Sequence, residues 1–216
     1  MAGKYTADAF QSDTGVSRET LERLEAYVAL LTKWQRRINL VGSRSLGDIW
    51  RRHMLDSAQL LDLGPASARV WVDVGSGAGF PGLVLAALGC GKVFLIEKDA
   101  RKCVFLREAV RLLEADAEVV ESRIEEIGES RQEDRPFPPP QVITARALAP
   151  LDRLLAMVAP LCGTETVCLF PKGLDVGREL TTIAKYSKLA VDELPSRTAA
   201  RAAVLRIRGL ADENRG

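Results

Sequence analysis

Residues 72–82 read VDVGSGAGFPG, and they place four glycines directly after an apolar run. Glycine lets the backbone approach a ligand closely, because it has no side chain and tolerates positive φ. If a helix follows, its first N–H groups attract phosphate-like or nucleotide-like ligands. This stretch therefore predicts a loop that binds a nucleotide-like cofactor, at the end of a strand.

Two classes of cofactor use such a loop, and the frame of the glycines separates them. Residues 77–82 formally match the dinucleotide pattern G-x-G-x-x-G. However, the strand ends at Val74, so the first turn is formed by residues 75–77, and the third glycine of the pattern would fall on Phe80. The alternative frame, with an acid at Asp73 and alternating glycines from Gly75, is typical of S-adenosylmethionine-dependent methyltransferases.

A carboxylate at the end of the next expected strand fits either cofactor. Glu97 follows Leu95 and Ile96, 22 residues after Gly75. A carboxylate at this position can accept hydrogen bonds from the ribose hydroxyls of an adenosine. Because NAD also contains adenosine, Glu97 supports an adenosine-containing ligand without choosing between the two, and an exposed acid at a strand end is the alternative interpretation.

The elements that must hold these residues follow from hydrophobic periodicity. Helices are expected over residues 17–38, 46–61, 80–88, 100–114, 149–161 and 176–186, strands over 70–74, 93–96, 119–120, 141–144, 165–170, 189–191 and 203–207, and a loop over 131–140. Strands that alternate with helices indicate βαβ units and a mostly parallel sheet. We therefore expect an α/β fold with a mostly parallel sheet, and an N-terminal helical extension (1–68) packed as one globular unit with the second domain (69–216).

Composition narrows the classes of function. The formal net charge is +1, but residues 33–52 hold six basic residues and one acid, which could face a nucleic-acid backbone or be a solvated helix face. No apolar run is long enough for a membrane span, and no signal peptide is visible. One histidine and four cysteines without a C-x-x-C pair do not suggest a metal site. We expect a cytoplasmic monomer with reduced thiols, mostly in the core.

Several motifs in order along the chain resemble one family, the bacterial small-subunit ribosomal RNA guanine-N7 methyltransferases called RsmG or GidB. The matching segments are Ile38-Asn39-Leu40, Arg52 to Ser57, Val72 to Gly82, Ser122 to Glu125, Ala145-Arg146-Ala147 and Lys172-Gly173. The resemblance covers roughly residues 20–208. It implies a Rossmann-like methyltransferase fold, S-adenosylmethionine as cofactor, and 16S rRNA or the 30S subunit as partner.

The resemblance also assigns residues to the cofactor. They are Gly75 and Phe80 in the glycine loop, Glu97 at the ribose position, Ile124 and Glu125 after the third strand, and Arg146 after the fourth. Gly77 of the same loop is a further candidate for cofactor binding. The chain departs from the family near its end and around Ser122. Many members have Arg-His before the last strand, whereas this chain has Arg201-Ala202, so any RNA contact by that histidine would be lost or moved here.

The identity of the methylated atom can be narrowed by excluding atoms whose methylation needs residues that this sequence lacks. Methylation of an exocyclic amine usually employs an Asp/Asn-Pro-Pro-aromatic turn after the fourth strand, but residues 144–148 read TARAL. Methylation of pyrimidine C5 needs a cysteine nucleophile, and none is expected near the site. Guanine N7 has a lone pair and no proton, so it requires only positioning. We therefore expect no catalytic acid or base.

Four basic side chains have competing interpretations. Arg146 could pair with the methionine carboxylate of the cofactor, contact RNA phosphate, or form a structural ion pair; we favour the cofactor. Arg123 and Lys172 follow strand ends on the edge of the glycine loop and could contact RNA or be surface charges. His53 is assigned to RNA contact, with a structural hydrogen-bonding role as the alternative; on an α-helix it could pair with Asp56.

Three other functions remain open from the sequence. A small-molecule methyltransferase of the same fold would not need the basic extension. An NAD-dependent oxidoreductase is disfavoured by Phe80 in the dinucleotide frame. A non-enzymatic RNA-binding domain is disfavoured because Asp73, Gly75 and Glu97 are all in place.

Overall fold

The computed structural model describes residues 5–173, 176–184, 186 and 188–213, with the backbone alone for residues 43, 44, 212 and 213. In this part of the chain, seven strands form one sheet in the order β3-β2-β1-β4-β5-β7-β6. The strands are β1 (Val70–Val74), β2 (Lys92–Glu97), β3 (Ala117–Glu121), β4 (Val142–Thr144), β5 (Val167–Lys172), β6 (Ala190–Pro195) and β7 (Ala203–Arg208). Strands β1 to β5 pair in parallel, and β7 pairs antiparallel with both β5 and β6. The mostly parallel sheet is therefore confirmed.

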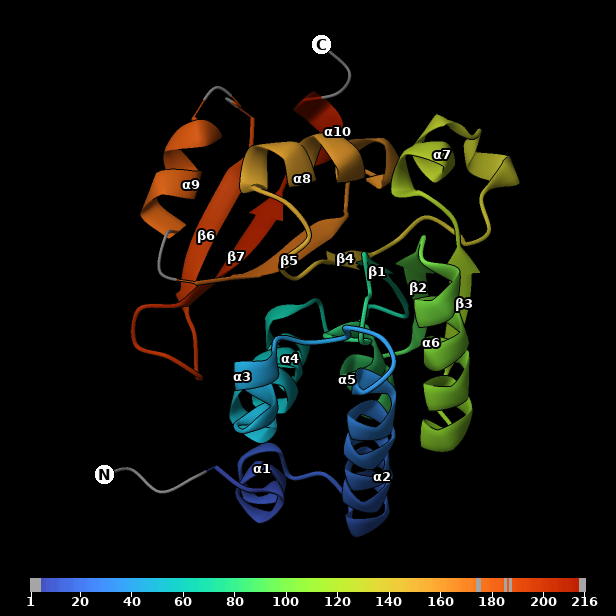
Figure 1. Cartoon of the computed structure of the whole chain (residues 1–216). Coiled ribbons are helices and arrows are strands. Elements are labelled where there is room, and N and C mark those ends of the chain that lie inside the picture. The colour runs from blue at the N-terminus through green and yellow to red at the C-terminus, as the bar shows by residue number, and fades with distance from the viewer. Residues whose placement is uncertain (1–4, 174–175, 185, 187, 214–216) are drawn as a thin grey trace.

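Helices cover both faces of the sheet (Figure 1). On one face lie α1 (Ala7–Thr14), α2 (Arg18–Gln35), α3 (Ser43–Leu46), α4 (Asp56–Ala58), α5 (Gly82–Ala87) and α6 (Ala100–Leu113). On the other lie α7 (Ile124–Glu129), α8 (Leu151–Val158), α9 (Val176–Thr182) and α10 (Leu210–Glu213). None of the helices in the described ranges is long and apolar enough to cross a membrane.

Strand residues alternate between two apolar cores, one on each face. Trp71 and Leu95 belong to the core shared with α2, α5 and α6, whereas Val72 and Ile96 belong to the core under α8. A strand directs successive side chains to opposite faces, so a strand buried on both faces reads as a continuous apolar run. The apolar run of β1 follows from this arrangement.

The N-terminal extension contributes to the first of these cores. Leu24, Tyr27 and Leu31 of α2 are fully buried there together with Phe105 of α6. Ser17 caps α2, as expected, because its hydroxyl accepts a hydrogen bond from the N–H of Thr20 at 3.1 Å. Helix α1 was not expected, since its sequence is mostly polar; it adds one fully buried side chain, Phe10.

The expected helix over 17–38 is too long at its C-terminal end. It ends at Gln35, whose side-chain oxygen accepts hydrogen bonds from the N–H groups of Leu40 and Val41. The side-chain amide of Gln35 also donates to the carbonyl of Val41 at 2.8 Å. These contacts turn the chain back on itself, although the apolar stripe continues to Ile38.

The expected helix over 46–61 is also wrong as a single α-helix. This region consists of α3, a π-helical segment η1 (Trp50–Leu55), the single turn α4 and the 3-10 turn Leu61–Leu63. In a π-helix the hydrogen bonds join residues i and i+5, so each turn is wider than in an α-helix. Residues three apart therefore do not line one stripe, which bears on His53 and Asp56 below.

Most other expected helices and strands begin and end within a few residues of those in the structure. The glycine-loop helix was expected from Phe80, but it begins only at Gly82, after a cis bond between Phe80 and Pro81. Helix α7 was missed, since only Ile124 and Ile127 are buried on it and the apolar pattern is short. The expected loop over 131–140 contains a 3-10 turn, Gln132–Asp134.

Candidate functional site

A cleft of about 410 Å³ opens at the carboxyl ends of the parallel strands. Its wall combines the glycine loop, the end of β2, the start of α7, the loop after β4 and residues of the N-terminal extension. All of the site residues proposed from the sequence lie in this wall except Lys172. The volume falls within the roughly 300–1,000 Å³ of typical small-molecule sites.

The glycine loop follows β1 and requires left-handed backbone at Gly75 and Gly77, with φ values of +67° and +56°. At Gly75 a Cβ atom would lie 2.6 Å from Cδ1 of Leu148, so a side chain here would displace the wall opposite. At Gly77 a Cβ would approach only the carbonyl of Gly75, at 3.7 Å, and the backbone faces the cleft. The loop thus brings bare backbone to the cavity.

Glu97 ends β2 beside this loop and is 7% exposed. Its carboxylate accepts hydrogen bonds from three backbone N–H groups: Gly77 at 3.0 Å on Oε2, and Lys98 and Asp99 at 2.8 and 2.9 Å on Oε1. An ionised carboxylate has about four acceptor positions. Glu97 therefore fixes the glycine loop and retains acceptor capacity at Oε2 for a hydroxyl in the cleft.

Asp73 lies beneath the loop and is completely buried. Its Oδ1 accepts a hydrogen bond from the hydroxyl of Thr144 at 2.7 Å, while Oδ2 has no hydrogen-bond partner among the described residues. Burial raises the pKa of Asp73 to about 6. The hydrogen bonds to this carboxyl act in the opposite direction and lower the pKa, and the bond from Thr144 has the largest effect among them. This acid supports the loop from below and does not line the cleft.

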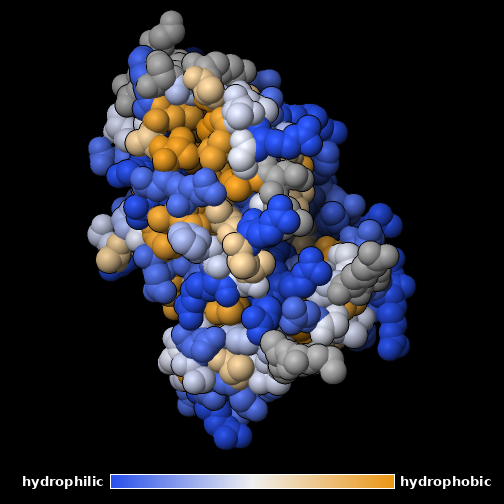
Figure 2. All heavy atoms as spheres, turned by 90° about the vertical axis from the view of Figure 1, so that its left-hand side faces the viewer, coloured by the Kyte–Doolittle hydropathy of each residue, from blue (hydrophilic) through white to orange (hydrophobic). Residues whose placement is uncertain are grey.

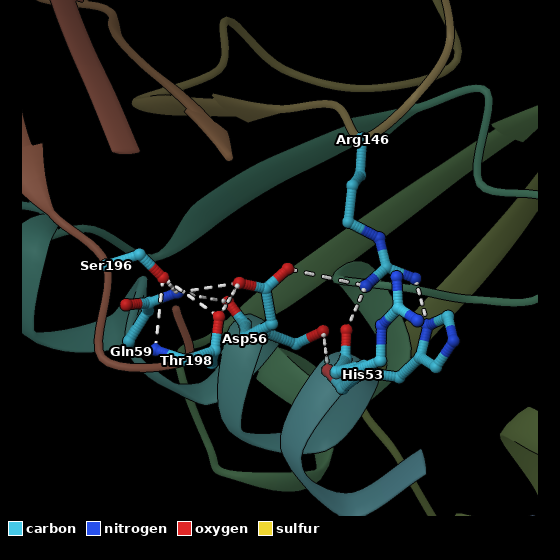
Figure 3. Close-up of polar contacts among 8 residues, drawn as sticks. His53, Asp56, Gln59, Arg146, Ser196 and Thr198 are labelled. Atoms are coloured by element: carbon cyan, nitrogen blue, oxygen red, sulfur yellow. Dashed lines mark hydrogen bonds and ion pairs between the residues drawn. The ribbon is translucent and has the colours of Figure 1, made fainter. Parts of the chain in front are cut away.

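Arg146 follows β4 and connects the cleft to the N-terminal extension. Its Nη1 lies 3.4 Å from Oδ2 of Asp56 and donates to the carbonyl of Arg52 at 3.0 Å. Its Nη2 contacts Nδ1 of His53, and its guanidinium carbon lies 5.2 Å above the ring centre of Phe80. Arg146 therefore lies in the cleft wall and also forms the structural ion pair that the sequence left open (Figure 3).

His53 is 7% exposed and packs on Phe80, with ring centres 4.7 Å apart. Burial and the charges of Arg146 and Arg52 lower its pKa to about 3, so the ring is neutral near pH 7. Since Arg146 donates to Nδ1, the ring proton is on Nε2, which has no hydrogen-bond partner among the described residues. The expected pairing with Asp56 is wrong: η1 is π-helical, and Arg146 lies between the two side chains.

The start of α7 and the loop after β4 complete the wall. Ile124 is buried, while Arg123 and Glu125 are exposed at the rim. Leu148 is 37% exposed and lies against Gly75, directly after Ala147, which has a φ of +53°. The wall therefore has an apolar side at Leu148 and a charged rim at α7.

Lys172 is not in the wall. Its ammonium group lies 2.6 Å from Oε2 of Glu179, and its side chain is 10% exposed. The same oxygen of Glu179 accepts the N–H of Leu151, the first residue of α8. Lys172 thus holds α8 and α9 to the sheet.

The four cysteines lie outside the described wall of this cleft. Cys90, Cys103 and Cys168 are buried, Cys162 is partly buried, and none lines the cavity. Burial raises the pKa of Cys103 to about 11, which keeps its thiol protonated. Across the described ranges, His, Cys, Asp and Glu side chains do not gather in a group of three that could hold a metal ion.

The basic residues of segment 33–52 are spread from the end of α2, through the turn that follows it, to η1. Arg36, Arg37 and Arg52 are exposed, and Arg51 stacks on Tyr5 at 5.0 Å from the ring centre. The side chain of Arg44 lies outside the described residues.

Sequence reasoning missed two residues that organise the site. Tyr27 was not among the candidates from the sequence, yet its hydroxyl donates a hydrogen bond to the carbonyl of Ala78 in the glycine loop. Asp56 was considered only as a partner of His53, although it pairs with Arg146. The Arg-His-Met-Leu-Asp-Ser block that contains Asp56 was the available signal.

Comparison with known proteins agrees with this geometry. The family model described as "rRNA small subunit methyltransferase G" (GidB) matches residues 20–201. The chain is 48% identical over 208 residues to the ribosomal RNA small subunit methyltransferase G of Parvibaculum lavamentivorans, covering 94% of this chain and 89% of that protein. It is 50% identical over 195 residues to the protein of the same name in Paramagnetospirillum magneticum, covering 90% and 91%.

Solved structures with the same fold are more distant in sequence. A cofactor-bound protein of MTB, Rv0187, superimposes with a TM-score of 0.64 at 15% identity, over 96% of this chain and 98% of that chain. A precorrin-6y methyltransferase of Geobacter metallireducens gives a TM-score of 0.51 at 14% identity, over 79% and 92%. These likenesses confirm the Rossmann-like fold, and the family model and relatives together show that this chain belongs to the GidB family of small-subunit ribosomal RNA methyltransferases.

Proposed function

We propose that this chain transfers a methyl group from S-adenosylmethionine to N7 of a guanosine in the decoding-region loop of 16S rRNA. The observation that carries the proposal is the single cleft in which the glycine loop, Glu97 and Arg146 lie together with the N-terminal block around His53. Family membership gives the reaction class and the kind of RNA. The chemistry of the cleft supports the target atom.

The residues of the cleft fit S-adenosylmethionine. Bare backbone at Gly75 and Gly77 admits the ligand closely, and the free acceptor capacity of Glu97 suits a ribose hydroxyl. Phe80, Ile124 and Glu125 line the remaining cavity. We assign the methionine carboxylate to Arg146, because a guanidinium matches a carboxylate geometrically. When bound, the cofactor supplies a methyl group on a sulfonium, which is a strong electrophile.

The side chains of the cleft support a reaction without a general base. Guanine N7 offers a lone pair and no proton, so the protein must bring N7 into line with the methyl group and exclude water. His53 is held neutral by burial, and its Nδ1 is already occupied by Arg146. We therefore propose that no side chain of this chain acts as a catalytic acid or base.

RNA contact is assigned to exposed positive charges around the cleft. Arg123 at the rim is well placed for a phosphate, and Arg36, Arg37 and Arg52 offer further exposed positive charge on the N-terminal extension. His53 remains a candidate through its Nε2 proton. Lys172 remains a prediction with less support, since Glu179 neutralises it.

We further propose that residues 1–68 and 69–216 act as one unit. The protein acts as a monomer in the cytoplasm, and its substrate is free rRNA or the assembled 30S subunit. The shared core of α2, α5 and α6 supports the single unit.

Transfer of a labelled methyl group tests the proposal. Purified protein is incubated with S-adenosylmethionine and either 30S subunits that lack the modification or naked 16S rRNA. Label in the RNA, followed by strand scission that is specific for N7-methylguanosine, is the expected result. Label at an exocyclic amine, or in a small molecule alone, would overturn the proposal. Parallel titrations with S-adenosylmethionine and NAD test the cofactor, and tighter binding of NAD would exclude a methyltransferase.

A further inference from the structure

Asp56 joins two segments of the chain that are distant from it in sequence, the loop after β4 and the loop between β6 and β7 (Figure 3). Its Oδ2 lies 3.4 Å from Nη1 of Arg146, in the cleft wall. Its Oδ1 accepts hydrogen bonds from Nε2 of Gln59 at 2.9 Å and from the hydroxyl of Thr198 at 3.1 Å. The Asp56 side chain is 15% exposed, so solvent does little to replace these contacts.

Thr198 belongs to the loop between β6 and β7, residues 196–202. Gln59 also binds this loop, because its Oε1 accepts the N–H of Arg197 at 2.9 Å. Thr198 is held within the loop by its own N–H, which donates to the hydroxyl of Ser196 at 3.1 Å. Asp56 and Gln59 therefore fix this loop against the N-terminal extension.

The loop presents positive charge to solvent. Arg197 and Arg201 are exposed, and Nη2 of Arg197 donates to the carbonyl of Asp13 at 3.3 Å. The loop lies beside α3 and α4 on the left of Figure 1. Seen from that side, the lower half of the molecule is mainly hydrophilic (Figure 2). The exposed guanidinium groups of Arg197 and Arg201 suit the phosphates of RNA.

The other carboxylate oxygen of Asp56, Oδ2, holds the guanidinium of Arg146. Among the described residues, the hydrogen-bond partners of Arg146 are the Asp56 carboxylate, the His53 ring and the carbonyl of Arg52. Of these three, Asp56 alone carries a negative charge. A buried guanidinium without a charged partner is costly, so the orientation of Arg146 depends on Asp56.

We propose that Asp56 is a positioning residue that couples the β6–β7 loop to Arg146, so that RNA contact at the loop and cofactor binding in the cleft strengthen each other. The proposal rests on the function proposed above. Its physical basis is that one carboxylate receives donors from both sides, and an RNA that orders the loop also orders the carboxylate that holds Arg146. By thermodynamic reciprocity, the cofactor then strengthens RNA binding by the same factor.

Thr198→Val tests the coupling, because it removes the hydroxyl that reaches Asp56 and leaves Arg146 unchanged in sequence. Binding of labelled S-adenosylhomocysteine is measured by equilibrium dialysis, with and without unmodified 30S subunits. In the wild type, the subunits should tighten this binding by about fivefold or more. In Thr198→Val the tightening should be lost. Thr198→Ser, which keeps the hydroxyl, should restore it.

Thr181→Val is the matched control. Thr181 is exposed on α9, and its hydroxyl donates only to the carbonyl of Arg178 among the described contacts. This variant should show the same tightening as the wild type. Asp56→Asn is less suitable as the main test, since it leaves Arg146 buried without a charged partner and could unfold the chain.

Two outcomes overturn the coupling: the wild type binds both S-adenosylhomocysteine and the 30S subunit but shows no tightening, or Thr198→Val retains the tightening, whether or not it binds the subunit more weakly. Failure of the proposed function is distinct from these results. In that case the wild type would bind neither S-adenosylhomocysteine nor the subunit, or would leave N7 unmethylated while the tightening and its loss in Thr198→Val are still observed.

Discussion

Tyr27 of α2 donates a hydrogen bond from its phenol to the backbone carbonyl of Ala78, 51 residues further along the chain. Its ring also packs against Phe80, with ring centres 5.5 Å apart. Tyr27 is fully buried, and Ala78 lies between Gly77 and Gly79 of the glycine loop. The N-terminal extension therefore supports the cofactor loop directly, in addition to carrying basic residues.

Tyr27→Phe should weaken both the fold and cofactor binding. The variant leaves the carbonyl of Ala78 without its buried donor, which costs about 1–3 kcal/mol of unfolding free energy. We expect that loss in urea denaturation, together with weaker binding of S-adenosylhomocysteine in calorimetry. Tyr5→Phe is the control, because it removes a phenol that bonds to Asp13 near the surface. Wild-type affinity in Tyr27→Phe would show that the loop holds its shape without this bond.

Arg146→Ala should weaken cofactor binding by about tenfold or more, because a charge-assisted pair with the methionine carboxylate is lost. Arg146→Lys should restore little of it, since an ammonium cannot form the same two parallel hydrogen bonds. Calorimetric titration with S-adenosylhomocysteine gives both values. Arg18→Ala, which removes an exposed ion pair with Glu22, is the control. Unchanged affinity in Arg146→Ala would refute the assignment of the carboxylate.

His53 should stay neutral across the physiological range. It is the only histidine in the sequence, so ¹⁵N-histidine labelling gives signals from one ring alone. Burial, together with Arg146 and Arg52, lowers its pKa to about 3. We expect a single tautomer with the proton on Nε2 from pH 5.5 to pH 8. A titration midpoint near 6.5, the ordinary pKa of histidine, would contradict the burial of this ring beside two guanidinium groups.

Asp73 should make stability depend on pH in a direction unusual for an acid. Its pKa is raised to about 6 in the folded chain, against about 3.9 when unfolded. The folded state therefore binds the proton more tightly, so this contribution is full below about pH 4 and is lost as pH rises through about 6.

Asp73→Asn removes this proton equilibrium and gives the matched comparison. Between pH 4 and pH 7, the unfolding free energy of the wild type should fall relative to that of the variant, by about 2 kcal/mol. Urea denaturation of both proteins at several pH values measures the difference. A difference that stays constant, or that changes in the opposite direction, would show that Asp73 is ionised in the folded state.

The sequence by itself determined the fold class and nine of the residues that line the cleft. Period-two and period-3.6 patterns are local, and the strand end at Val74 set the frame of the glycine loop. Parallel strands place their carboxyl ends at one edge, so Gly75, Glu97 and Arg146 could be expected near one another from their positions alone. The Rossmann-like fold and the family were predicted correctly for these reasons.

Only the tertiary structure decided which polar groups pair. The π-helical turn of η1 separates His53 from Asp56, and Arg146 takes the place between them. Lys172 is neutralised by Glu179, whose position depends on how α9 packs. Contacts such as Tyr27 with Ala78, or Asp56 with Thr198, join residues 51 and 142 positions apart. Periodicity describes which face of an element is apolar, whereas these pairs depend on how separate elements are packed together.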